Sequence, residues 1–276
     1  MKKIYGKLKG KGLSRFFPTN FFAKLAIRNM KGDHTVNVQD FKMTVPIKEP
    51  HGMVLYLKGV YEPAMTNFIN LYLREGQNFV DVGACLGYYS LLASHIVKDT
   101  GKVLAFEPEW TNLTYLEENV GYSKYKNIEV IQKAASDRVG EWPLNISDHI
   151  GCHSLLHFDL THSKNPLTQI TTTIPVDQCI DRIDMIKIDV EGWEYYVLKG
   201  IESFLALNEN KITVLMEYCP SLLNENELMK GSLLELLKLY AVSIFILDDI
   251  TCELKKITVD ELLHLKERVN LVWWTK

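Results

Sequence analysis

Closely spaced cysteines are absent from this sequence. The five cysteines form no CxxC pair, and no histidine lies at zinc-ligand spacing near them; they are Cys85, Cys152, Cys179, Cys219 and Cys252. This scatter gives no indication of a zinc site. Reduced thiols in a cytoplasmic protein are the simplest interpretation, because oxidising compartments favour paired cysteines.

Long apolar runs are also absent. No stretch reaches the roughly 18 apolar residues that a bilayer-spanning helix needs, and the N-terminus lacks the continuous apolar core of a signal peptide. We therefore expect neither a membrane span nor export. With 47% hydrophobic and 24% charged residues, the composition is that of a soluble globular protein that can bury a sizeable core.

Acidic side chains are missing from residues 1–32, which contain nine of the 31 Lys and Arg residues. The rest of the chain carries 22 basic and 34 acidic side chains. Because the phosphates of nucleic acids bind to basic surfaces, the acidic excess after residue 32 argues against a nucleic-acid partner. The basic, aromatic leader predicts either peripheral contact with an anionic membrane through residues 1–31 or a solvated arm that packs on the main domain. The oligomeric state stays open.

Three segments are expected along the chain. Residues 1–33 are the basic extension. Residues 34–60 alternate apolar and polar positions in two stretches, 34–47 and 53–60, and this alternation predicts an antiparallel β-hairpin. Residues 61–276 are expected to form the main domain.

Strands and helices alternate in this main domain. Short apolar runs separated by segments of helical periodicity favour a doubly wound, mostly parallel α/β sheet. The last apolar segment, residues 270–276, predicts an antiparallel edge strand, and a polar insertion over 138–175 is expected to cover a ligand pocket. The earlier strands are expected over 78–83, 103–108, 128–136, 184–189 and 211–218, and helices over 62–73, 84–97, 111–122 (with Thr111 as N-cap) and 194–207.

An acidic residue lies at the end of each of the five earlier strands. These residues are Asp81, Glu107, Asp137, Asp189 and Glu217. In open α/β sheets, ligands bind outside the carboxyl ends of the strands. We therefore expect the five acids to converge on one crevice.

The turn after the first strand contains two glycines. Gly83 permits a sharp turn, and Gly87 would let a ligand approach the N-terminus of the next helix. A turn of this kind is a weak signal by itself, because any strand-to-helix connection can use glycine. Glu107 strengthens it, since a carboxylate at the second strand end can accept both hydrogen bonds of a ribose diol. The pattern indicates an adenosine-containing ligand.

The choice between NAD and S-adenosylmethionine depends on the same turn. The spacing from Gly83 to Gly87 is not GxGxxG, and Asp81 at the strand end would repel a pyrophosphate. An acidic side chain at this position favours the binding of a sulfonium cation. S-adenosylmethionine is therefore the expected cofactor, and a dehydrogenase is disfavoured.

Several segments resemble the FkbM family of S-adenosylmethionine-dependent methyltransferases. The resemblance implies a class I methyltransferase (Rossmann-like) fold, with a mostly parallel seven-stranded sheet, helices on both faces and an antiparallel C-terminal edge strand. It also implies O-methylation, often of sugar hydroxyls. The matching segments are YEP at 61–63, NFVDVGACLGYYS at 78–90, AFEPEW at 105–110, AASD at 134–137 and IKIDVEGWEYYVLKG at 186–200, with Glu217 after them.

The resemblance also implies which residues bind the cofactor. Glu107 would bind the ribose, whereas Ser136 and Asp137 would border the adenine. Asp189 would face the cofactor from its strand end. The family usually has Asn where this chain has Cys85. The methionine end would be lined by Asp81, Gly83, Ala84 and Gly87.

Methyl transfer requires an acceptor oxygen held behind the sulfonium carbon, and a neutral alcohol must lose its proton. Asp189 and Glu191 are the expected general base or substrate-orienting pair. His153 in the insertion could reach the pocket, and a histidine titrates near working pH, although the sequence favours an ordinary surface loop position for it. Lys187 is expected to point to the other side of its strand in a structural role.

Other interpretations stay open. Asp189 and Glu217 could hold a divalent cation, but two acids are a weak signature, and no metal is expected. The acceptor is expected to be a small molecule or saccharide. A peptide or nitrogen acceptor is the alternative, as is a non-catalytic adenosine-binding scaffold on the same fold.

Overall fold

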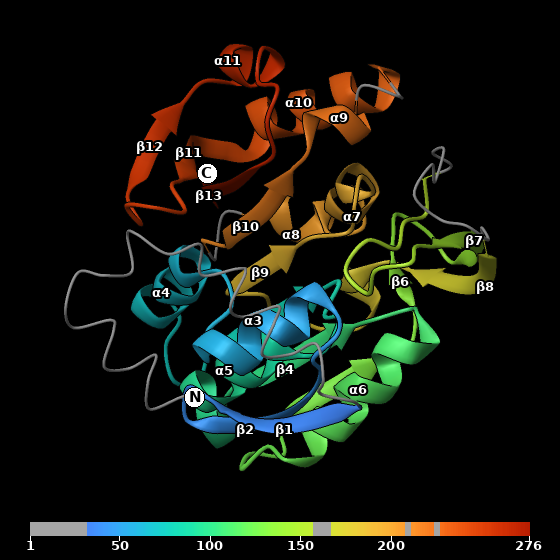
Figure 1. Cartoon of the computed structure of the whole chain (residues 1–276). Helices are drawn as coiled ribbons and strands as arrows, with labels where there is room; N and C mark the ends of the chain where they lie inside the picture. Colours follow the sequence, from blue (N-terminus) through green and yellow to red (C-terminus); the bar gives the residue numbers. More distant parts are fainter. Residues whose placement is uncertain (1–31, 157–166, 208–210, 224–226) are drawn as a thin grey trace, which may run out of the picture. The chain divides into compact units, whose positions relative to one another are not determined.

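The computed structural model describes residues 32–156, 167–207, 211–223 and 227–276 (Figure 1). The chain divides into two compact units, Met1–Tyr61 and Glu62–Lys276. The basic leader expected over residues 1–31 lies outside the described residues. None of the helices in the described part of the chain combines the length and the apolar surface that a bilayer crossing needs.

The described part of the first unit contains a β-hairpin and a helix. Strands β1 (Asp33–Val38) and β2 (Phe41–Pro46) pair antiparallel, with Val38 opposite Phe41. Two residues therefore connect them, and the first of these, Gln39, has φ +50°. The hairpin is complete within the first of the two alternating stretches.

Helix α3 (Pro50–Lys58) follows the hairpin. The strand expected over 53–60 is therefore wrong. Pro50 occupies the first turn, and Gly59 ends the helix in a left-handed conformation with its N–H bonded to the carbonyl of Leu55. Proline at the start and glycine at the end are typical of a helix. The alternation of apolar and polar residues over 53–60 is too short to indicate a strand.

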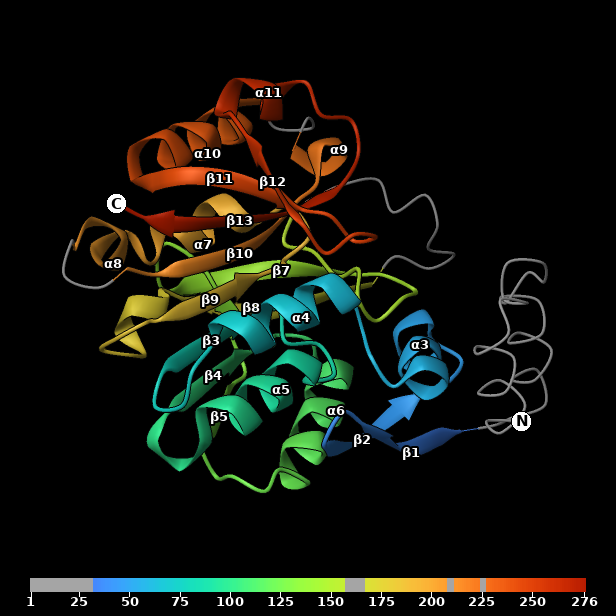
Figure 2. The ribbon, with the colours of Figure 1, turned by 90° about the vertical axis from the view of Figure 1, so that its left-hand side faces the viewer.

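The second unit is built on an eight-stranded sheet in the order β12-β11-β13-β10-β9-β3-β4-β5 (Figures 1 and 2). From β5 to β10 the neighbouring strands are parallel, whereas β13 is antiparallel to both β10 and β11. The doubly wound α/β prediction is confirmed. The strands are β3 (Asn78–Val82), β4 (Lys102–Phe106), β5 (Ile128–Ile131), β9 (Met185–Ile188), β10 (Thr213–Tyr218), β11 (Ala241–Leu247), β12 (Leu254–Ile257) and β13 (Val269–Thr275).

The expectation of seven strands with a C-terminal edge strand needs correction. The C-terminal strand β13 is antiparallel but lies inside the sheet, between β10 and β11. The edge is the additional strand β12, in which Lys255 and Lys256 are exposed. Lysines protect edge strands from further pairing, and they leave β12 without the apolar pattern that would reveal a strand.

Helices cover both faces of the sheet. One hydrophobic core joins Val80 and Val82 of β3 to Val197 of α7 and to α10. Asp81, between the two valines, points to the opposite face and accepts a hydrogen bond from Ser90 of α5. The helices of this unit are α4 (Pro63–Tyr72), α5 (Tyr88–Val97), α6 (Trp110–Gly121), α7 (Glu194–Lys199), α8 (Glu202–Ala206), α9 (Pro220–Leu223), α10 (Glu227–Tyr240) and α11 (Val259–Leu263), with 3-10 turns at Lys98–Thr100 and Val176–Gln178.

Two predicted elements are divided in the structure. The strand expected over 128–136 splits into β5 and β6 (Ala134–Ala135), and β6 joins a second sheet of three strands in the order β6-β8-β7. Strands β7 (Gly140–Ile146) and β8 (Leu167–Ile174) come from the polar insertion. The helix expected over 194–207 breaks at Gly200, where a Cβ atom would lie 2.0 Å from the carbonyl oxygen of Ser136.

Candidate active site

The exits of strands β3 and β9 meet backbone to backbone. Residues Val82 and Ile188 are paired at the ends of these parallel strands, so the next residues, Gly83 and Asp189, emerge side by side. Gly83 has φ +78°, and a Cβ atom there would lie 2.0 Å from the carbonyl oxygen of Asp189. Only glycine fits this turn.

Lys187 lies among the strand-end acids. Its Nζ donates a hydrogen bond to the carbonyl of Gly83 at 2.8 Å and lies 3.5 Å from Asp81 Oδ1 and 3.6 Å from Asp189 Oδ2. The expectation that Lys187 points away is wrong, because residues two apart on a strand share a face and Lys187 pairs with Asp81 in register. Burial lowers the pKa of Lys187, but Asp189 and Asp81 outweigh burial and hold this pKa above its ordinary value. Lys187 is a fixed positive charge.

Asp81 is enclosed by protein. Its side chain is 0% exposed, and its Oδ2 accepts a hydrogen bond from Ser90 Oγ at 2.6 Å. The other oxygen, Oδ1, has no hydrogen bond in the described part of the chain and faces Lys187. In this conformation Asp81 acts on the site through Lys187, so direct contact with the methionine end stays a prediction.

Glu62 and Tyr89 extend the network on the far side of Lys187. Glu62 precedes α4 with φ +35°, and its Oε2 accepts a hydrogen bond from Tyr89 Oη at 2.5 Å. The ammonium of Lys187 lies 5.6 Å from the centre of the Tyr89 ring, within range of a cation–π interaction. Burial and the charge of Asp189 raise the pKa of Glu62. Glu62 lies within the YEP segment at 61–63, and the sequence predicted no role for it.

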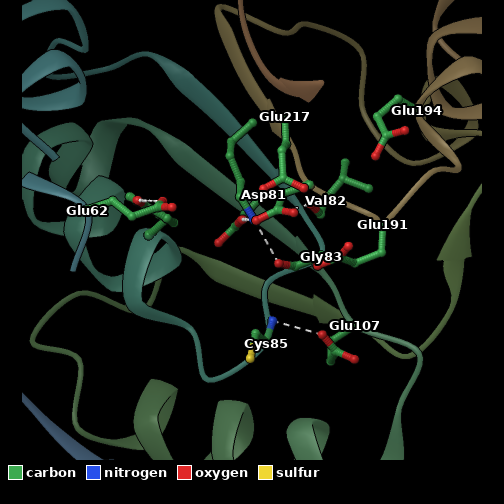
Figure 3. Close-up of polar contacts among 12 residues, drawn as sticks. Glu62, Asp81, Val82, Gly83, Cys85, Glu107, Glu191, Glu194 and Glu217 are labelled. Atoms are coloured by element: carbon green, nitrogen blue, oxygen red, sulfur yellow. Dashed lines mark hydrogen bonds and ion pairs between the residues drawn. The ribbon is translucent and has the colours of Figure 1, made fainter. Parts of the chain in front are cut away.

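Glu107 closes the β4 end of the site. Its Oε2 accepts the N–H of Cys85 at 2.8 Å (Figure 3). Its Oε1 accepts the N–H of Glu109 at 2.9 Å. Burial raises the pKa of Glu107 to about 7. The side chain of Asn112 also forms a hydrogen bond with this carboxylate. Binding of a ribose diol by Glu107 stays a prediction.

The rest of the first turn explains two sequence features. Cys85 has φ +50°, the left-handed region in which Asn is the favoured residue after Gly, which accounts for the Asn that the family usually has there. Ala84 is buried, and its N–H binds the carbonyl of Phe106. Gly87 has φ +86°, and a Cβ atom on it would lie 2.6 Å from Leu116 Cδ1 of α6. Its approach to a ligand stays a prediction.

Ser136 and Asp137, expected to border the adenine, follow β6. Ser136 Oγ accepts a hydrogen bond from Trp193 Nε1 at 3.3 Å and donates to Asp137 Oδ1 at 3.3 Å. Asp137 also lies 3.6 Å from Nε of Arg138. Trp193 thus connects this pair to the loop after β9. Their contact with a cofactor stays a prediction.

Asp189, Glu191 and Glu217 form an acidic cluster. One carboxylate oxygen from each lies within 4.8 Å of the other two. The Asp189 side chain is 34% exposed, whereas those of Glu191 and Glu217 are 9% and 10% exposed. Burial, followed by the charge of Asp189, raises the pKa of both glutamates against the opposing charge of Arg268. The convergence expected from the strand ends includes Asp189 and Glu217.

Arg268 supplies a positive charge to this cluster. Its Nη2 lies 2.9 Å from Glu191 Oε2 and its Nη1 lies 3.0 Å from Glu217 Oε1. A divalent cation held by these acids would therefore have to share both glutamates with a guanidinium. The role of Arg268 could not be predicted from the sequence, because a basic residue at the end of a charged, helix-like segment is usually an ordinary surface residue.

Glu194 is a further buried acid that the sequence did not reveal. Its Oε1 accepts the N–H of Gly192 at 3.0 Å, and its Oε2 has no hydrogen bond in the described part of the chain. Burial raises the pKa of Glu194 to about 7. In the sequence, Glu194 stands at the start of a predicted helix, where acidic residues are favoured for another reason. Its burial could therefore not be predicted.

The insertion reaches the acidic cluster through Ser154. Ser154 Oγ donates a hydrogen bond to the main-chain oxygen of Glu191 at 2.6 Å. The neighbouring His153 accepts the N–H of Ser147 with Nδ1 at 3.0 Å, and its Nε2 lies 3.9 Å from Glu109 Oε2. Glu109 caps α6 by accepting the N–H of Asn112, so the expectation that Thr111 is the N-cap is wrong. A catalytic role for His153 stays a prediction.

The fold is that of a class I methyltransferase, with its candidate site at the carboxyl ends of the parallel strands. A family profile described as "Methyltransferase FkbM domain" matches residues 81–240, more than half of the chain. The chain belongs to this FkbM methyltransferase family.

Solved structures with some likeness to this chain include three methyltransferases. An FkbM methyltransferase from Methylobacillus flagellatus is 16% identical over 80% of this chain, with a TM-score of 0.43, and this chain spans only 52% of its length. A SAM-dependent methyltransferase from Aquifex aeolicus is 14% identical, with coverage of 78% and 90% of the two chains and a TM-score of 0.44. A SAM-dependent O-methyltransferase from Thermotoga maritima is 14% identical, with coverage of 91% and 81% and a TM-score of 0.42. These TM-scores are too low to carry a functional argument. The comparison with curated proteins gives no significant match.

Proposed function

We propose that the protein transfers the methyl group of S-adenosylmethionine to a hydroxyl oxygen of a sugar or glycoconjugate. The observation that carries this proposal is the position of Asp189. Its carboxylate is the most exposed of the acidic cluster, and its backbone touches the glycine turn at Gly83. A carboxylate beside the cofactor turn is where a base for an acceptor hydroxyl has to be.

The cofactor part of the proposal depends on Glu107 and on the sign of the local charge. The carboxylate of Glu107 suits a ribose diol. The acidic residues around Lys187 favour a sulfonium cation and oppose the pyrophosphate of a dinucleotide. S-adenosylmethionine, when bound, supplies the electrophilic methyl group.

The chemical step needs few protein groups. The acceptor oxygen attacks the methyl carbon while the carbon–sulfur bond breaks, and the bonding pair leaves with sulfur as S-adenosylhomocysteine. The hydroxyl proton passes to the carboxylate of Asp189. Lys187 Nζ lies 3.6 Å from Asp189 Oδ2 and so contributes to the orientation of this carboxylate.

A nitrogen acceptor is the second candidate. The observation in its favour is the excess of buried acids next to Asp189, namely Glu191, Glu217 and Glu194. Such a cluster attracts a cationic amine more strongly than a neutral alcohol. The product of the reaction separates the two candidates.

Cofactor binding is tested by calorimetric titration with S-adenosylhomocysteine and, separately, with NAD. Glu107→Gln is compared with Glu253→Gln, a control on an exposed acid. We expect saturable binding of S-adenosylhomocysteine alone, weakened by roughly tenfold or more in Glu107→Gln, because a hydrogen bond to a charged group is lost. Binding of NAD alone, or of neither ligand, would contradict the proposal.

The acceptor is tested by transfer of a tritiated methyl group from S-adenosylmethionine to methyl glycosides, amino sugars and peptides. We expect an O-methylated glycoside, with a rate that falls by roughly a hundredfold or more in Asp189→Asn, as for loss of a general base. Asp181→Asn is the control, because Asp181 is exposed. An N-methylated product would favour the second candidate, whereas cofactor binding without any transfer would overturn both and favour a non-catalytic scaffold.

A further inference from the structure

Arg268 makes a two-sided contact with the acidic cluster. It lies between α11 and β13, and it approaches Glu191 with Nη2 to Oε2 at 2.9 Å and Nη1 to Oε1 at 3.3 Å. The same Nη1 lies 3.0 Å from Glu217 Oε1. A guanidinium that engages both oxygens of a carboxylate fixes its direction as well as its charge.

The exposure of these side chains shows which group covers the others. The Arg268 side chain is 47% exposed, whereas those of Glu191 and Glu217 are 9% and 10% exposed. The arginine therefore covers two buried carboxylates. Without a counter-ion, carboxylates in such positions take up protons or turn toward water.

The positive charges of the site are divided between two sets of acids. Lys187 approaches Asp189 and Asp81, and Arg268 approaches Glu191 and Glu217. The main chain of Glu191 is also held, because it has φ +50° and its oxygen accepts the hydroxyl of Ser154. Glu191 is fixed at both ends, whereas Asp189 retains the largest exposed fraction of the three acids.

We propose that Arg268 is a positioning residue for methyl transfer: it holds Glu191 and Glu217 as an oriented pair and leaves Asp189 as the carboxylate that faces the acceptor. This inference rests on the proposed function. It assigns Glu191 a supporting part, in contrast to the paired role expected from the sequence. No family motif in the sequence pointed to Arg268.

Carboxyl-carbon NMR of the full chain tests the contact of Arg268 with Glu191 and Glu217, and this experiment needs no acceptor. Side-chain glutamate signals are assigned with Glu191→Gln and Glu217→Gln and then titrated in Arg268→Met. We expect the pKa of both glutamates to rise by about 1 to 3 units, because an opposite charge within hydrogen-bond distance is lost while Asp189, Glu194 and Lys187 stay in place. Arg268→Lys should raise the pKa of the two glutamates less, because lysine keeps the positive charge but cannot contact both oxygens of a carboxylate as a guanidinium does. If the pKa values of Glu191 and Glu217 are unchanged in Arg268→Met, the proposal that Arg268 holds these two glutamates is overturned.

Lys266→Met is the matched control for these titrations. Lys266 is an exposed cation in the same loop. The control should leave both glutamate titrations unchanged. Arg268→Lys also keeps the test decisive if Arg268→Met does not fold.

The positioning role is tested with the acceptor identified from the glycoside panel. In Arg268→Met we expect kcat to fall by about tenfold or more, whereas the affinity for S-adenosylhomocysteine changes less than about twofold. Added methylguanidinium should restore part of kcat in Arg268→Ala. A kcat equal to that of the wild type would overturn the role. If the wild type methylates nothing, the proposed function fails, and the NMR titration still decides separately whether Arg268 holds the two glutamates.

Discussion

The ammonium of Lys187 lies 3.5 Å from Asp81 Oδ1, on the neighbouring strand, and both side chains are buried. Through Lys187, this pair is connected to the turn after β3 and to the acidic cluster. Lys187 donates a hydrogen bond to Gly83 on one side and approaches Asp189 on the other. The following predictions begin with it.

Lys187→Met is expected to lower the free energy of unfolding by about 3 to 5 kcal/mol, because it leaves Asp81 as an uncompensated buried charge. Urea unfolding followed by circular dichroism measures the effect. The double variant Lys187→Met with Asp81→Asn should recover part of the loss, since the charge is then gone. A Lys187→Met variant as stable as the exposed-site control Lys266→Met would contradict the pairing.

Gly83→Ala is expected to lower the free energy of unfolding by about 3 kcal/mol, because it combines a strained positive φ with overpacking against the carbonyl of Asp189. It should also abolish the binding of S-adenosylhomocysteine in calorimetry. Gly231→Ala is the matched control: Gly231 lies in α10, and a Cβ atom there meets nothing within 4 Å. The control should be neutral or stabilising by up to about 1 kcal/mol. Equal effects at the two glycines would contradict the close contact.

Cys85→Asn is expected to raise stability by about 0.5 to 1 kcal/mol, whereas Cys85→Val should lower it by about 1 to 3 kcal/mol. The reason is the positive φ of Cys85, which Asn tolerates and a β-branched residue does not. Thermal unfolding of the two variants measures the difference. The hydrogen bond from the Cys85 N–H to Glu107 should persist in Cys85→Asn, so the affinity for S-adenosylhomocysteine should be kept. A reversed order of stability would exclude a left-handed turn here.

Glu194 gives the protein a pH-dependent stability. Burial raises its pKa from 4.5 to about 7 in the folded state, so between these values the folded chain binds more protons than the unfolded chain. Stability from this group is therefore present at low pH and is lost as the pH rises through the folded pKa.

Glu194→Gln removes this dependence. Relative to Glu194→Gln, the wild type should lose on the order of 3 kcal/mol of unfolding free energy between about pH 4.5 and about pH 8. Urea unfolding at several pH values measures the difference. The other acids with raised pKa, such as Glu191, are present in both proteins and cancel. Parallel pH profiles of the two proteins would show that Glu194 titrates normally.

The strand-end acids could be predicted from the sequence because parallel strands place their carboxyl ends together. Asp189 follows β9 and Glu217 lies near the end of the neighbouring strand β10, so their proximity needs only the order of the strands. The neighbour of Gly87 was not predictable in the same way, because Leu116 belongs to another helix and sequence spacing does not show that the two residues meet.

Contacts between distant segments were the part that could not be predicted. Arg268 lies 77 residues from Glu191 and meets it only after β13 enters the sheet between β10 and β11. Lys187 was misplaced for a different reason: the prediction relied on the alternation of side chains along the strand, but Lys187 and Asp189 are two residues apart and share a face, where Asp81 of the neighbouring strand also lies. Strand β12 escaped prediction because its exposed lysines hide its pairing with β11.

The contact between Gly83 and the carbonyl of Asp189 has a mechanical consequence. Because no side chain lies between the two main chains, no rotamer change can absorb a displacement of either loop. The turn after β3 and the loop after β9 should therefore move as one rigid element. Under the proposed function, with the methyl donor in this turn and Asp189 as the base, seating the donor would set the distance at which the acceptor is activated, before the acceptor arrives.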